Sequence, residues 1–164
     1  MEYTLPSDNI NFFQSLIGQK IIEVNRRLLE SDLYLKDYEQ MADGATELVF
    51  DDGKVISFFS WTEIFSVGVV ANEKIPRSGK YSIYKNLTNN SFWKQRVNQK
   101  ITKVTIFKSI YATEDNALEF GIEFEFENES KVCIEYVDGK EISDTLRVIE
   151  QNEETRCTSL VIDK

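Results

Sequence analysis

The sequence contains no histidine. This absence excludes a Ser-His-Asp or Cys-His nucleophile system and any zinc site that depends on imidazole ligands. The only two cysteines, Cys133 and Cys157, are too few to complete a structural zinc site. General acid–base chemistry near neutral pH would require an Asp, Glu or Lys with a strongly shifted pKa. We therefore expect a protein that is not an enzyme and that binds neither a metal nor a cofactor.

Proline and glycine are scarce, with 2 and 7 copies in 164 residues, and this scarcity argues against long linkers. Because no run of about 18 apolar residues is present, we expect no membrane-spanning segment. The first residues, MEYTLP, have neither the basic nor the apolar region of a signal peptide. The two distant cysteines fit reduced thiols. These features predict a cytoplasmic protein with no membrane partner.

The abundant residues indicate a folded, β-rich chain. Hydrophobic residues make up 41% of the sequence and aromatic residues 12%, including 11 Phe and 7 Tyr. Aromatic side chains are enriched in strands, and this length is sufficient for one hydrophobic core. We therefore predict a single domain over residues 1–164.

An internal repeat appears when the chain is aligned with itself at an offset of 80 residues. The segment FFQSLIGQKIIEV at 12–24 and the segment FWKQRVNQKITKV at 92–104 share five of 13 positions. A second block aligns ELVFDDGKV at 47–55 with EFEFENESKV at 123–132. The repeat predicts two related halves, at about 8–70 and 89–150, joined by a connector at about 71–88.

Each half is expected to begin with a short helix. The apolar spacing predicts a helix at 8–17, which Gly18 ends because glycine accepts the left-handed conformation after a helix. Asn98 stands at the matching position of the second half, where a helix is predicted to follow a cap at Asn89 or Asn90. Asparagine is the other residue that tolerates this conformation.

Strands are expected to follow each helix. In the first half they are predicted at about 20–29, 45–51, 54–60 and 65–70, and in the second at about 100–111, 117–127, 131–137 and 145–150. A short strand at 81–84 and a last strand at 156–162 have no partner in the repeat. We predict an α+β fold, a pseudo-duplicated unit in which each half is a short helix followed by an antiparallel four-stranded meander, both packed as one domain. The sequence leaves open a continuous sheet, a barrel or a sandwich.

The net charge of −9 is distributed unevenly. Residues 1–73 have a net charge of −8, residues 74–113 have +9 with no acidic residue, and residues 114–154 have −11. The average charge therefore conceals a basic stretch between two acidic ones.

The most regular acidic stretch, at 120–127, alternates apolar and acidic residues. This period of two predicts that the phenylalanines face the core and the glutamates face solvent. Such a row of like charges would be compensated by the lysine-rich strand at 100–111 or by a basic partner. The candidate partner-binding residues are Glu119, Glu123, Glu125, Glu127 and Glu135, with Asp51 and Asp52 as a weaker set that a tight turn also explains.

Two other functions stay open. The basic stretch at 74–113 contains interleaved aromatic residues, which is typical of a nucleic-acid or anionic-ligand surface. However, Phe92 and Trp93 are already explained as a helix face, and the acidic remainder would repel phosphate, so we expect no nucleic-acid partner. An enzyme with a carboxylate centre is the second alternative, which a glutamate with a raised pKa in a deep pocket would favour.

The stretch DGATELVFDDGKVI at 43–56 resembles hairpins of small bacterial immunity proteins from polymorphic toxin and contact-dependent growth inhibition systems. The resemblance implies tight binding to one cognate toxin, often basic when it is a nuclease, through a complementary acidic surface. Immunity families have no shared active-site motif, so no functional residue is transferred. Partner identity and oligomeric state are left open.

Overall fold

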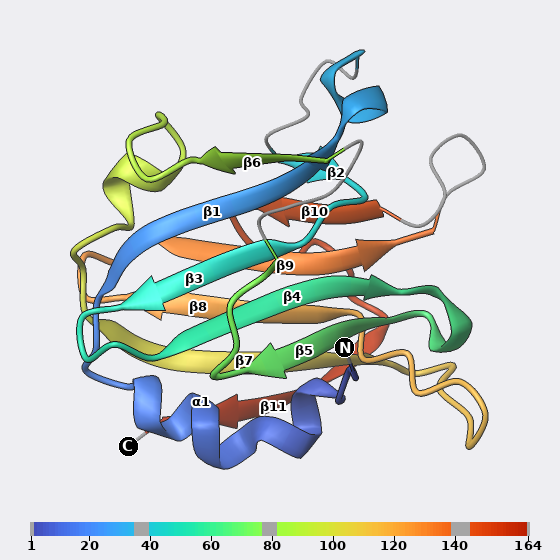
Figure 1. The fold of residues 1–164 in the computed structure, drawn as a ribbon. Helices are drawn as coiled ribbons and strands as arrows, with labels where there is room; N and C mark the ends of the chain where they lie inside the picture. The colour runs from blue at the N-terminus through green and yellow to red at the C-terminus, as the bar shows by residue number, and fades with distance from the viewer. Residues whose placement is uncertain (1, 35–39, 77–81, 139–144, 164) are drawn as a thin grey trace.

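Two antiparallel sheets pack face to face and form most of the molecule (Figure 1). The computed structural model describes residues 2–34, 40–76, 82–138 and 145–163. In the first sheet the strand order is β5 (Ser66–Ala71), β4 (Val55–Trp61), β3 (Thr46–Phe50), β1 (Ile21–Leu29) and β6 (Ser82–Asn86). In the second sheet it is β11 (Cys157–Ile162), β7 (Ile101–Ser109), β8 (Gly121–Phe126), β9 (Lys131–Val137), β10 (Thr145–Ile149) and β2 (Met41–Ala42).

Helical structure is limited to one α-helix and short 3-10 turns in the described residues. The helix α1 (Ile10–Leu16) follows the turn η1 (Pro6–Asn9) and lies across the edge of the sandwich near β5 and β11 (Figure 1). Further 3-10 turns are η2 (Glu30–Tyr34), η3 (Thr62–Ile64) and η4 (Trp93–Gln95). No helix in this described part of the chain is long and apolar enough to cross a membrane.

The positions of the predicted strands are confirmed to within a few residues. The strand expected at 131–137 is β9, and the one expected at 20–29 is β1. The first predicted helix is also present, and Gly18 ends it with a φ of 86°. These elements were predictable because their apolar periodicity and turn residues are local signals.

The predicted fold class, two halves each built of a helix and a four-stranded meander, is wrong. The described chain is mostly β, with one α-helix and eleven strands in two sheets. The second helix does not form; the turn η4 stands in its place.

The side chain of Arg96 binds backbone carbonyls at η4. Its guanidinium donates a hydrogen bond to the carbonyl of Phe92 (Nη1–O 2.5 Å). In an α-helix this carbonyl would accept the backbone N–H of Arg96. That N–H donates instead to the carbonyl of Trp93 at 2.8 Å, which is the 3-10 pattern. The guanidinium also donates to the carbonyl of Lys131 and lies over the Phe92 ring.

Each half also contributes a fifth strand; both strands were predicted, at 81–84 and 156–162, but their equivalence in the repeat was not. β6 pairs with β1 on the side away from β3, and β11 pairs with β7 on the side away from β8. The halves therefore have the same order, β5-β4-β3-β1-β6 and β10-β9-β8-β7-β11. The strand at 156–162, expected to lack a counterpart, corresponds to β6, and β2 is an addition to the second sheet.

Local details also match between the halves. Both β1 and β7 have a register shift near their first residues, Ile21/Glu23 and Ile101/Lys103. Asn98 has a φ of 65°, close to that of Gly18. The halves meet at an antiparallel bridge between Lys20 and Lys100. Positions related by this arrangement, at an offset of 80 in β1/β7 and 76 in β3–β4/β8–β9, are called equivalent below.

The core lies between the two sheets and is rich in aromatic rings. The Phe124 ring of β8 makes edge-to-face contacts with Phe58 of β4 and Phe13 of α1, at centroid distances of 6.1 and 6.3 Å. Arg26 of β1 is fully buried and donates to the carbonyls of Ala42, at 2.8 Å, and Leu146. Burial lowers its pKa to about 10, so the guanidinium stays charged at neutral pH and joins β1 to β2 and β10.

Candidate functional site

Three of the predicted glutamates are buried, so the expectation that they face solvent is wrong. Glu119 is 4% exposed, Glu123 7% and Glu135 4%. Glu119 accepts hydrogen bonds from the Ser7 N–H and Oγ, both at 2.8 Å, and so holds η1 against the second sheet.

The chain between β10 and β11 explains the burial of Glu123. Residues 150–156 connect β10 with β11, which pairs with β7 at the opposite edge of the second sheet. On this path they cross the outer face of the sheet, which is the face away from the core. We call this segment the second strap. Glu123 accepts the N–H of Asn152 at 2.9 Å and lies 3.9 Å from the Lys131 ammonium.

The first half has an equivalent carboxylate, which the sequence argument missed. Glu47 is fully buried and accepts the Ile75 N–H at 2.8 Å, the Tyr84 hydroxyl at 2.5 Å and the Asn25 amide at 3.1 Å. Ile75 belongs to residues 72–76, which lie on the outer face of the first sheet and are called the first strap. The signal was present, because Glu47 and Glu123 head the second block of the repeat.

The remaining predicted residues are more exposed and lie elsewhere. Glu125 pairs with Lys103 of β7 at 3.1 Å, so one neighbouring lysine does compensate the acidic strand. Glu127 accepts the Lys100 N–H at 3.3 Å. The tertiary structure thus separates the predicted acidic row into several internal contacts.

The weaker acidic set lies at hairpin turns. Asp51 accepts the Lys20 N–H at 3.0 Å, and Asp52 forms an ion pair with Lys54. Because Lys20 bridges to Lys100, Asp51 and Glu127 lie on the two sides of the junction between the halves. These contacts stabilise the turns, and Asp51 and Asp52 do not line the cleft described next.

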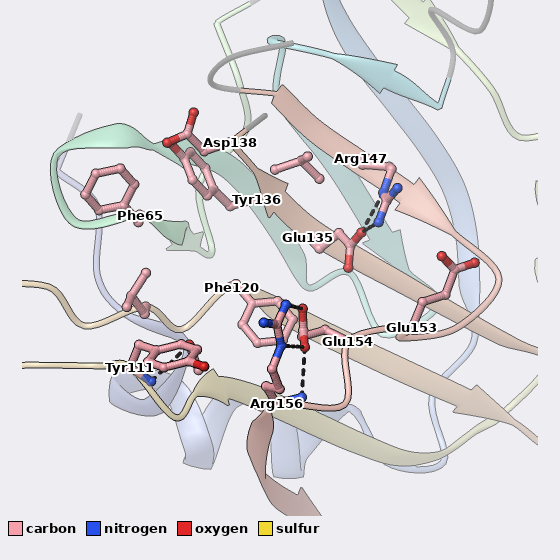
Figure 2. Close-up of a pocket in the computed structure, with 13 residues that line it drawn as sticks. Phe65, Tyr111, Phe120, Glu135, Tyr136, Asp138, Arg147, Glu153, Glu154 and Arg156 are labelled. Atoms are coloured by element: carbon pink, nitrogen blue, oxygen red, sulfur yellow. Dashed lines mark hydrogen bonds and ion pairs between the residues drawn. The ribbon is translucent and has the colours of Figure 1, made fainter. Parts of the chain in front are cut away.

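A cleft of about 550 Å³ opens at one end of the second sheet, and we call it the outer cleft (Figure 2). Aromatic rings and charged side chains line it: Phe65, Tyr111, Phe120, Tyr136, Glu135, Asp138, Arg147, Glu153, Glu154 and Arg156. Figure 2 shows Phe65 and Tyr111 on one side and Arg147 and Glu153 on the other. Tyr111 is 63% exposed, so most of its side chain is open to solvent.

Two ion pairs organise the charges of the cleft. Glu135 and Arg147 are cross-strand partners in β9 and β10, and Arg147 Nε donates to the Glu135 carboxylate at 2.5 Å. Arg156 Nε donates to the Glu154 carboxylate at 3.1 Å. In the described residues, Asp138 and Glu153 have neither a hydrogen bond nor an ion pair, so the lining carries two uncompensated negative charges.

Glu135 has a perturbed pKa. Burial raises the pKa of its carboxyl, the guanidinium of Arg147 opposes this shift, and the charges of Glu153 and Glu154 add to it. The cleft therefore contains a carboxylate that takes up a proton at a higher pH than an ordinary glutamate.

Two cations of the basic stretch at 74–113 are engaged in internal contacts. Arg96 is buried and bonded to backbone carbonyls, and Lys103 is paired with Glu125. This leaves fewer free cations than the count in the sequence implies.

The two cysteines differ in burial: Cys133 is buried and Cys157 is half-buried. Both thiols are free, and burial raises the pKa of the Cys133 thiol well above its usual range. Among the described residues, no group of three or more Cys, Asp or Glu side chains is placed to hold a metal ion.

Sequence reasoning found only Glu135 among the residues of the outer cleft. It missed Phe65, Tyr111, Arg147 and Glu153, which come from four separate segments with no shared motif. No protein-family model, curated protein or solved structure matches this chain.

Proposed function

We propose that this chain is a non-catalytic protein-binding domain of the immunity type, which binds and neutralises a cognate basic toxin in the cytoplasm. The partner docks at the outer cleft. The observation that carries the proposal is a pair of carboxylates, Asp138 and Glu153, that have no hydrogen bond or ion pair within the described residues and that line the cleft together with the exposed ring of Tyr111.

The proposed contact surface is the outer cleft and not the acidic stretch at 120–127 that the sequence suggested. Glu119 and Glu123 are engaged in internal hydrogen bonds, so a partner would have to break those bonds to use them. Glu135 lines the outer cleft and keeps its proposed role there. A surface with an excess of negative charge accelerates association with a basic protein and selects against acidic ones.

Co-expression with the toxin encoded beside this chain tests the proposal. We expect growth to be restored and a complex to be isolated, with an association rate that falls as salt is added. The charge-reversal variant Asp138→Lys/Glu153→Lys should lose both effects. The control Glu30→Lys/Glu73→Lys makes the same change in net charge at exposed positions outside the cleft and should retain them. Absence of a complex or of any neighbouring toxin gene would contradict the proposal.

A second candidate function rests on the pKa of Glu135. A buried carboxylate with a raised pKa in an open cleft is a feature of general acids, and other carboxylates lie near it. Assays of glycoside hydrolysis with the wild type and Glu135→Gln test this candidate. Turnover that the substitution abolishes would support an enzyme, and no turnover by the wild type would reject it.

A further inference from the structure

The first half contains a filled counterpart of the outer cleft. Phe59 is equivalent to Glu135, and its cross-strand partner Gly68 corresponds to Arg147, the partner of Glu135. The ring of Tyr3 lies over this pair. It stacks on Phe59 at a centroid distance of 4.8 Å, and a Cβ atom built on Gly68 would lie only 3.0 Å from its Cγ.

The N-terminal segment brings Tyr3 to this position. Thr4 pairs with Val69 at the edge of β5, through N–O distances of 3.0 and 2.9 Å. In the second half, Gln40 accepts the N–H of Val148, the corresponding residue of β10, at 2.7 Å. The edges of both sheets are therefore occupied by backbone. Above the cross-strand pair, however, the first half has the side chain of Tyr3, and the second half has an open cleft.

The chemistry of the open place differs from that of the filled one. Phe59 and Gly68 are covered by the ring of Tyr3, whereas Glu135 and Arg147 form an ion pair at the base of the outer cleft. Both guanidiniums of the cleft are already paired with carboxylates, and Glu153 and Asp138 stand at opposite sides without partners in the described chain (Figure 2). The site therefore favours a cation over an anion.

We infer that the outer cleft receives an arginine side chain from the partner protein, in the place that Tyr3 fills in the first half; this rests on the proposed function. A guanidinium is planar, so it can stack on the rings of Tyr111 or Phe120 while it donates to the carboxylate of Glu153. A lysine ammonium has the same charge, but it is more strongly hydrated and lacks the planar face.

A titration with short blocked peptides tests the inference. Each peptide has one variable residue between glycines: arginine, lysine or the neutral analogue citrulline. NMR of the isotope-labelled chain should show saturable shifts at the amides of Tyr111, Phe120 and Glu153 with the arginine peptide. The lysine peptide should bind more weakly, and citrulline should not bind. Equal binding of arginine and citrulline, or no saturable shift in the cleft, would overturn the inference.

Matched variants locate the site. Asp138→Asn/Glu153→Gln should weaken arginine-peptide binding about tenfold, because two exposed charge interactions are lost. The control Glu30→Gln/Glu73→Gln should leave it unchanged. The toxin assay separates the two proposals: if the toxin is still neutralised while the arginine peptide fails to bind, only this inference fails, and if no toxin complex forms, the proposed function fails.

Discussion

The five equivalent strands have the same order in both sheets, but different side chains and segments cover the outer faces of the two sheets. In the first half a strap and the N-terminal segment cover the face. Ile75 of the strap packs with Ala45, Phe59 and Val70 beneath it, and its N–H is accepted by one buried carboxylate, Glu47. In the second half the strap covers charged residues, and the outer cleft stays open. Two copies of one arrangement have therefore diverged, so that the outer face is filled in one and holds an open cleft in the other.

The largest expected effect separates the two strap carboxylates. Glu47→Ala should lower the free energy of unfolding by about 3 kcal/mol, because it leaves several buried donors without an acceptor. Glu123→Ala should cost only about 1 kcal/mol, because one backbone N–H, that of Asn152, loses its acceptor at a less buried site. Urea denaturation measures both. Equal losses would show that the two straps stabilise the fold to the same extent.

The second prediction compares the filled site with the open one. Tyr3→Ala should destabilise the chain by about 2 kcal/mol, because it removes the stacking on Phe59 and the edge contact with Trp61. Tyr111→Ala should change stability by less than about 0.5 kcal/mol, because this side chain is mostly exposed. Thermal unfolding compares them, and a large loss for Tyr111→Ala would mean that the outer cleft is part of the folded framework.

The pH dependence of stability tests the difference between Glu135 and its equivalent Phe59. Because the pKa of Glu135 is raised in the folded state, the folded chain binds this proton at a higher pH than the unfolded chain. The wild type should therefore gain stability relative to Glu135→Gln as the pH falls from neutral toward the ordinary glutamate pKa. Denaturation of both proteins across this range measures the difference, and a difference that is independent of pH would contradict it. The equivalent position, Phe59, cannot contribute such a dependence.

The smallest expected effect concerns Ser57, which is equivalent to Cys133. The Ser57 hydroxyl is buried and has no hydrogen-bond partner in the described structure. Ser57→Cys, which copies the residue of the second half, should stabilise the chain by about 0.5 kcal/mol, because a thiol loses less than a hydroxyl when it is left unpaired. Chemical denaturation with repeated measurements can detect this gain, and a clear loss would indicate that the larger sulfur does not fit.

The fold was partly predictable, for reasons that differ between its elements. The strands followed from alternation, and Gly18 and Asn98 marked two turns that share a left-handed backbone. The second helix was predicted wrongly: its apolar residues form the turn η4, where the Arg96 guanidinium binds backbone carbonyls, a contact that depends on side-chain placement. The equivalence of β6 and β11 in the two halves was missed because those strands share little sequence similarity.

The candidate site was predictable only at Glu135. Period two correctly separated Phe124 from Glu123 on the two faces of β8, but it does not reveal what covers the outer face. The strap that buries Glu123 comes from residues 150–156, which are distant in sequence and contain no apolar alternation. The residues of the outer cleft share no spacing that a linear pattern could detect.

The sequence by itself determined a β-rich chain with strands at nearly their observed positions, because hydrophobic periodicity and turn chemistry act over a few neighbouring residues. It also determined that histidine chemistry is absent. Only the tertiary structure decided which glutamates are buried as internal acceptors and which carboxylates line the outer cleft beside aromatic rings. That decision depends on where two straps and the N-terminal segment cross the sheets, and such crossings are set by packing between residues far apart in the chain.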